Sequence, residues 1–77
     1  MYKYSSKLPK IPVGEDLYLR ANMVEPNMGV LCLKNSNFLP FSDKQYPIAR
    51  NLARKRGLID IHGDLTETAK LLLRLLQ

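Results

Sequence analysis

Residues 16–23 alternate strictly between polar and apolar side chains, and this pattern restricts the fold more than any other feature of the chain. A period of two places successive side chains on opposite faces of an extended strand, so one face is expected to be buried. Glu25-Pro26-Asn27 then supplies turn residues, and residues 29–34 form a second, largely apolar run. We therefore predict a β-hairpin over residues 16–34, with Leu17, Leu19, Ala21 and Met23 on its buried side.

A basic amphipathic helix is predicted over residues 47–56. Ser42 and Gln45 have the spacing of a capping box before it, and Gly57 is a natural terminator. The expected inner face consists of Ile48, Ala49, Leu52 and Ala53. The opposite face consists of Arg50, Asn51, Arg54 and Lys55.

The segment after this helix predicts a short hairpin and a second helix. His62 and Gly63 separate a β-branched run at residues 58–61 from a brief return at residues 64–65. Asp64 or Thr66 is expected to cap a leucine-rich helix. Its core stripe is predicted to be Ala69, Leu72, Leu73 and Leu76, widened by Leu71 and Leu75. Earlier in the chain, residues 38–41 predict a short third strand or a buried loop.

The length and composition limit the chain to one small domain. Its 77 residues are 45% hydrophobic and 25% charged, which is typical of a globular protein with a single core. Prolines and lysines in residues 1–14 predict a basic extended arm. A single small α+β domain is predicted over residues 15–77, with an N-terminal β-hairpin, a basic amphipathic helix, a short wing-like hairpin and a C-terminal leucine-rich helix.

The sequence contains no recognisable catalytic or cofactor-binding pattern. One histidine, His62, and one cysteine, Cys32, exclude a His/Cys metal cluster, and the four glycines form no phosphate-binding loop. No apolar run is long enough to span a membrane, and residues 1–7 do not lead into a secretory signal. The lone cysteine favours a reducing, cytoplasmic setting. We therefore expect a cytoplasmic binding protein that is not an enzyme and needs no cofactor or metal.

The positive charge of the chain is clustered. The formal net charge is +5. Most of the cations lie in two segments, residues 1–10 and residues 43–56, and the only acidic residue across both is Asp43. Guanidinium groups suit phosphates and guanine edges, and asparagine can read adenine in the same groove. DNA is the expected partner, with RNA as the alternative; a merely solvated helix face is the competing interpretation. The predicted nucleic-acid-binding residues are Arg50, Asn51, Arg54, Lys55, Arg56, Lys44, Lys3, Lys7 and Lys10.

The last helix carries more leucine than one face of a small core usually needs. Either it is central to the core, or it also packs against another chain. A homodimer is one possibility. The other is a larger host or partner protein, bound by a small modulator of the kind that phages and plasmids encode. The predicted interface residues are Leu71, Leu72, Leu75 and Leu76.

Leu52 followed by Arg56-Gly57-Leu58-Ile59, and then Leu65-Thr66 before a leucine-rich helix, resembles the second half of winged-helix DNA-binding domains. The resemblance covers residues 46–77. It implies a recognition helix that ends at Gly57, a wing hairpin, and a last helix that serves dimerisation. In outline, a sheet followed by a basic helix is also similar to the arm-site-binding domains of phage-type integrases. That similarity implies a sheet that enters the major groove, with residues 17–20 on its first strand.

Overall fold

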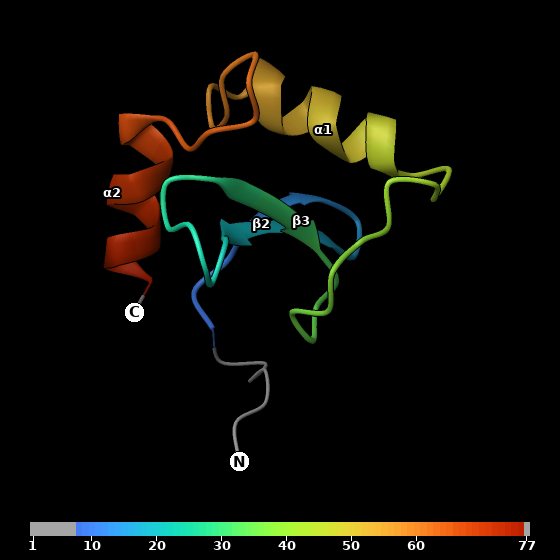
Figure 1. The fold of residues 1–77 in the computed structure, drawn as a ribbon, viewed down its shortest axis with the longest axis horizontal. Helices are drawn as coiled ribbons and strands as arrows, with labels where there is room; N and C mark the ends of the chain where they lie inside the picture. The colour runs from blue at the N-terminus through green and yellow to red at the C-terminus, as the bar shows by residue number, and fades with distance from the viewer. Residues whose placement is uncertain (1–7, 77) are drawn as a thin grey trace.

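The computed structural model describes residues 8–76, which form a three-stranded antiparallel sheet with two helices packed against it (Figure 1). The architecture is the predicted small α+β fold. Along the chain the elements are β1 (Ile11–Gly14), β2 (Leu17–Ala21), β3 (Gly29–Cys32), α1 (Tyr46–Lys55) and α2 (Glu67–Leu75). The strand order in the sheet is β1-β2-β3.

Strands β2 and β3 form the hairpin that the alternating pattern predicts. Leu19 lies opposite Leu31, and Ala21 lies opposite Gly29. The Asn22 side-chain oxygen accepts hydrogen bonds from the backbone N–H groups of Val24 and Glu25. These bonds hold the start of the turn. Leu17, Leu19 and Leu31 are buried on the face of the sheet that α1 covers.

The sheet also includes residues that the sequence assigned to the extended arm. Ile11 pairs with Leu19, and both Ile11 and Val13 are buried in the core. Pro12 between them is exposed, as a proline on an edge strand can be. The apolar side chains of Ile11 and Val13 thus draw this segment into the domain, which begins before residue 15. The first seven residues of the predicted arm lie outside the described part of the chain.

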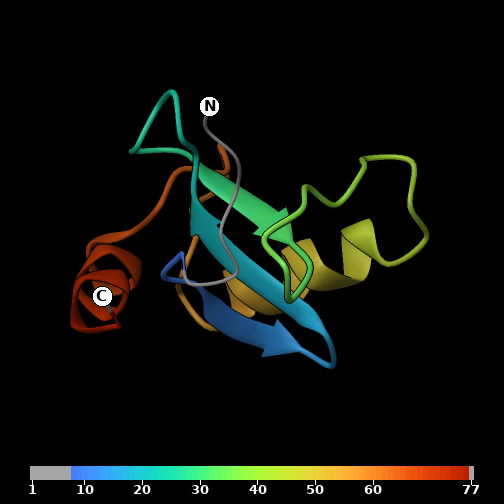
Figure 2. The same cartoon turned by 90° about the horizontal axis from the view of Figure 1, so that it is seen from below.

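Helix α1 lies across one face of the sheet (Figures 1 and 2). Its two fully buried residues, Ala49 and Ala53, have the small side chains that allow a close approach. Ile48 was predicted to face the core but is 57% exposed. Helix geometry explains this exposure, because Ile48 lies roughly 120° around the helix from the line through the two alanines.

Both ends of α1 are held by backbone and side-chain hydrogen bonds. At the C-terminus, Gly57 has a φ of 71°, its N–H bonds to Arg54 O, and Leu58 N–H bonds to Ala53 O. This is a Schellman motif, so Gly57 acts as the predicted terminator. The predicted capping box is wrong, because the N-cap residue Gln45 makes no side-chain capping bond. Instead, Asp43 Oδ1 accepts a hydrogen bond from Gln45 N–H at 2.8 Å.

The predicted short hairpin forms in a minimal version, as a tight turn over residues 60–64 between two short antiparallel segments. Ile59 and Leu65 form an isolated antiparallel bridge, and Asp64 forms another with Met28 in the turn before β3. The Asp60 carboxylate accepts hydrogen bonds from the N–H groups of His62 at 2.8 Å and Asp64 at 3.0 Å. These bonds lower the pKa of Asp60, with the bond from Asp64 the largest contribution. The ionised carboxylate therefore stabilises the turn.

Helix α2 begins at its predicted cap but buries a narrower stripe than predicted. Thr66 Oγ1 accepts a hydrogen bond from Ala69 N–H at 3.3 Å. Only Ala69 and Leu73 of the helix are buried. Leu72 and Leu76 were predicted to be core residues but are 37% and 53% exposed. These leucines are exposed because α2 lies beside the sheet and contacts β1. Only one side of the helix is therefore covered (Figure 2).

Candidate nucleic-acid interface

The outer face of α1 carries three cations and an asparagine. Arg50, Asn51, Arg54 and Lys55 are all exposed, as the amphipathic pattern predicts. The opposite side of the helix is fixed to the sheet through Ala49 and Ala53. Because the backbone is docked in this way, the four polar side chains project from a rigid support, and only their own rotamers must be ordered on binding.

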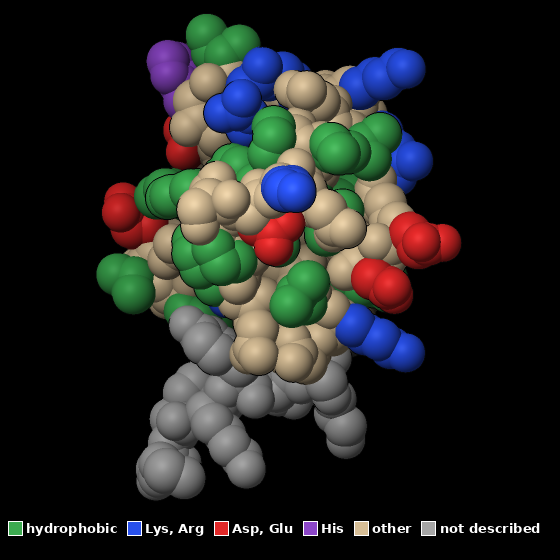
Figure 3. Space-filling model, turned by 90° about the vertical axis from the view of Figure 1, so that its right-hand side faces the viewer, with side chains coloured by type: hydrophobic (Ala, Val, Ile, Leu, Met, Phe, Trp, Pro, Cys, Tyr) green, Lys and Arg blue, Asp and Glu red, His purple; other side chains and the backbone are tan. Residues whose placement is uncertain are grey.

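The cations of this face have no acidic neighbour within the helix. No acidic residue occurs between Lys44 and Arg56. Within residues 8–76 the cations of α1 form no ion pair, since the pair found there joins Lys70 to Glu67. Arg54 and Lys55 also lie in the last turn, where they complement the helix dipole. Figure 3 shows Lys and Arg side chains gathered at the end of the molecule where α1 lies.

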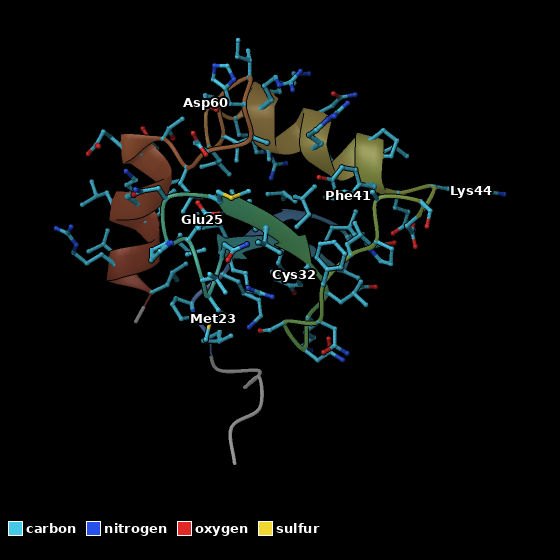
Figure 4. All side chains as sticks on the ribbon, in the orientation of Figure 1. Met23, Glu25, Cys32, Phe41, Lys44 and Asp60 are labelled. Atoms are coloured by element: carbon cyan, nitrogen blue, oxygen red, sulfur yellow. The ribbon has the colours of Figure 1, made fainter. Side chains whose placement is uncertain are left out.

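Arg56 and Lys44 extend this surface at the two ends of α1. Arg56 is the C-cap residue; it is exposed, and its Nη1 donates a long hydrogen bond of 3.4 Å to Pro12 O. Lys44 is exposed in the turn before the helix and projects away from its N-terminal end (Figure 4). Both predicted residues therefore lie next to the α1 surface.

The lysines of the predicted arm are not brought to α1 within the described residues. Ile11 points into the core, so Lys10, the residue before it, points to the other side of the sheet. Its Nζ donates a hydrogen bond to Leu8 O at 2.9 Å. Its charge also acts on Cys32, which lies on that same side. Lys3 and Lys7 fall outside the described part of the chain.

The sheet does not offer Arg20 to a ligand, although the similarity to integrase domains implied a role for its strand. Arg20 is 4% exposed, and its Nε donates a hydrogen bond to Ser36 O at 3.1 Å. Cys32 is fully buried nearby. Burial raises the pKa of the Cys32 thiol, partly offset by the positive charges of Arg20 and Lys10. Arg20 and Cys32 on this face of the sheet are therefore buried and not available to a ligand.

A row of aromatic side chains beside α1 was not predicted as part of a site. The ring of Phe41 makes edge-to-face contacts with Phe38, at a centroid distance of 5.6 Å, and with Tyr46, at 4.9 Å. Phe41 is largely exposed next to the start of α1 (Figure 4). Residues 38–41 were predicted to form a short strand or a buried loop. In the structure only Leu39 of this apolar run is buried, and the phenylalanines on either side of it, Phe38 and Phe41, are exposed.

The predicted interface leucines are exposed on α2. Leu71, Leu72, Leu75 and Leu76 all lie outside the core, and the first and third are 55% and 72% exposed. In the described residues no group of three His, Cys, Asp or Glu side chains is arranged to hold a metal ion. Neither α1 nor α2 has the length and apolar content that crossing a bilayer would require. Comparisons with protein-family models, curated proteins and solved structures found no match.

Proposed function

We propose that this chain is a small nucleic-acid-binding protein with a regulatory or accessory role, and that α1 is its binding element. The observation that carries the proposal is the outer face of α1. Arg50, Asn51, Arg54 and Lys55 are exposed there, free of ion pairs within residues 8–76, on a helix docked to a sheet.

The size of α1 suits the major groove of duplex DNA. A helix with its side chains is about 10–12 Å in diameter and the groove is about 12 Å wide, and the ten residues of α1 extend about 15 Å. In such a groove Arg50 and Arg54 would donate bidentate hydrogen bonds, and Asn51 would contact a base edge. Arg56 and Lys44 would neutralise phosphates at either end of the helix. DNA is therefore the proposed partner, and RNA is the alternative that the experiment below includes.

The dependence of affinity on salt tests the proposal. On mixed-sequence DNA the arginines have no specific base to bind and would contact phosphates. If the five cations of this surface then neutralise about five phosphates, log K should fall against log salt with a slope of about −4.5 for a duplex. The measurement is fluorescence anisotropy with mixed-sequence duplex DNA, single-stranded DNA and duplex RNA. No binding to any of the three at low salt would show that the cations of α1 only solvate the helix.

Charge reversal locates the site. Arg50→Glu should weaken binding at least tenfold and make the salt slope shallower by about one or more, since one phosphate contact is lost and a repulsion is added. Lys34→Glu is the matched control, because Lys34 is exposed in the turn after β3 and its reversal changes the net charge equally. Equal losses in the two variants would mean that binding follows net charge alone and would remove α1 as the site.

A second function class has its own supporting observation. The exposed leucines of α2 are the kind of apolar surface that binds protein, so a modulator of a larger protein is the alternative proposal. The two functions differ in the element that they use. Arg50→Glu should leave a protein partner bound through α2, whereas Leu71→Glu should release it. Co-precipitation with the two variants separates them.

A further inference from the structure

The outer face of α2 combines apolar and charged side chains in a regular order. With about 100° per residue, the direction opposite buried Ala69 and Leu73 is occupied by Leu71, with Leu75 and Glu67 on either side. Arg74 follows on the Glu67 side. The face thus has an acidic residue in its first turn, a basic residue in its last turn and leucine between them.

A shallow hollow of about 310 Å³ lies on this face. Its lining includes Glu67, Lys70, Leu71 and Arg74. These positions have the spacing i, i+3, i+4 and i+7, which is the spacing of the four side chains that form the hole in knobs-into-holes packing. The hollow therefore suits a single side chain from a facing helix.

We propose that the facing helix is α2 of a second copy of this chain, in an antiparallel pair whose two-fold axis passes close to Leu71. The lining residues run from Glu67 to Arg74, so the middle of the hollow along the helix is at residues 70 and 71, and Leu71 of each copy would pack into the hollow of the other. In the same register, Glu67 faces Arg74 of the second copy, since these two positions are equally far from residues 70 and 71. One arrangement satisfies both the packing and the charges.

The charges on α2 select the antiparallel orientation. In an antiparallel pair the equivalent flanks of the two helices meet, so the Glu67–Arg74 contact occurs twice. A parallel pair would separate Glu67 of one copy from Arg74 of the other by seven residues, about 10 Å along the helix, so this contact could not form. Lys70 is the one charged residue of this flank that meets its own copy. Its Nζ lies 4.0 Å from Glu67 Oε1 in its own helix, which reduces the repulsion between the two lysines but does not abolish it.

The small size of α2 sets the strength of the pair. Nine residues with three exposed leucines, followed by exposed Leu76 at the C-cap, offer less area than a standard interface. We expect a reversible dimer with a dissociation constant on the order of 10–100 µM. Dimerisation through α2 does not depend on nucleic-acid binding through α1. Arg50 lies on α1, so Arg50→Glu should leave the dimer unchanged, and each of the two proposals can fail without the other.

Mixing two charge variants tests the pairing. Glu67→Lys and Arg74→Glu should each weaken the dimer at least tenfold, because each places like charges together at both contacts. An equimolar mixture of the two variants should dimerise again, since both contacts of the mixed pair are attractive. Sedimentation velocity of the full chain over a concentration series measures this. The effect of each variant on its own helix is the same alone and in the mixture, so recovery reports the contact between chains.

Cross-linking tests the register. Leu71→Cys should form a disulfide-linked dimer under mild oxidation, because residue 71 lies at the two-fold axis. Leu75→Cys is the matched control: its two copies would be separated by about 12 Å along the helix, beyond the reach of a disulfide. The native Cys32 is fully buried and does not compete.

Relief of the Lys70 repulsion completes the test. Lys70→Gln should tighten the dimer severalfold. A wild-type chain that stays monomeric through the series, or equal cross-linking of the two cysteine variants, would overturn the proposal. A monomer that instead binds a different protein through Leu71 would assign this face to a heterologous partner.

Discussion

Thr66 joins the end of α1 to the start of α2. Its hydroxyl donates a hydrogen bond to Gly57 O and accepts one from Ala69 N–H. Its backbone N–H bonds to Leu58 O at 3.1 Å. A single side chain therefore holds both the glycine turn that terminates the basic helix and the first turn of the leucine-rich helix.

Removing the Thr66 hydroxyl should lower the stability of the whole domain. We expect Thr66→Ala to reduce the free energy of unfolding by about 1–2 kcal/mol, because the cap and a second hydrogen bond are lost together. Thr66→Ser retains the hydroxyl and should lose less than half as much. Urea denaturation measures both values. Equal losses would show that the methyl group, and not the hydroxyl, is responsible.

At the scale of the element, the turn between the two helices depends on one carboxylate. Asp60 N–H bonds to Asp64 O at 3.0 Å, and Gly63 N–H bonds to Asp60 O at 3.1 Å. Gly63 has a φ of 86°, which favours glycine at this position. The Asp60 carboxylate adds the two side-chain bonds that close the turn at its exposed tip, at the C-terminal end of α1 (Figure 4).

The stabilisation by Asp60 should depend on pH. The pKa of Asp60 is lower in the folded chain than its ordinary value, so its stabilising effect is present at neutral pH and is lost as the pH falls below about 4. Asp60→Ala should melt at a lower temperature than the wild type at pH 7, and the difference should shrink towards pH 3. Asp60→Asn, which retains an uncharged acceptor, is the control. A difference that stays constant with pH would show that charge plays no part.

The whole molecule uses the two faces of its sheet differently. One face carries α1 and the main hydrophobic core. On the other, Arg20, Cys32 and Ser36 are buried, and the Ser36 carbonyl is bound by Arg20. Since Cys32 is fully buried on this face, its thiol should become accessible only when the structure around it opens.

Thiol labelling should therefore report global unfolding. We expect Cys32 to react with a soluble disulfide reagent roughly five-thousandfold more slowly in buffer than in denaturant, given a stability near 5 kcal/mol. In the folded chain, burial also raises the pKa of the Cys32 thiol, so direct reaction of the native state does not compete with this route. The rate should increase in Thr66→Ala by the factor that matches its loss of stability. Rapid labelling of the native chain would contradict the enclosed position.

Local spacing alone determined much of this protein. The alternation at residues 16–23 predicted β2 and its hairpin with β3, because a strand exposes its side chains with a period of two. The helical period and Gly57 predicted α1 to within one residue at each end, with the exposure of Arg50 and Arg54. These features depend on neighbours in the chain, and a sequence shows such neighbours directly.

Contacts between distant residues decided the rest. Ile11 and Val13 became part of the sheet only because β2 was available as a partner, and this pairing turned Lys10 away from α1. The position of α2 beside the sheet left Leu72 and Leu76 outside the core, although their spacing alone suits burial. Burial depends on which surfaces meet, and helical or strand periodicity identifies a face without identifying what covers it.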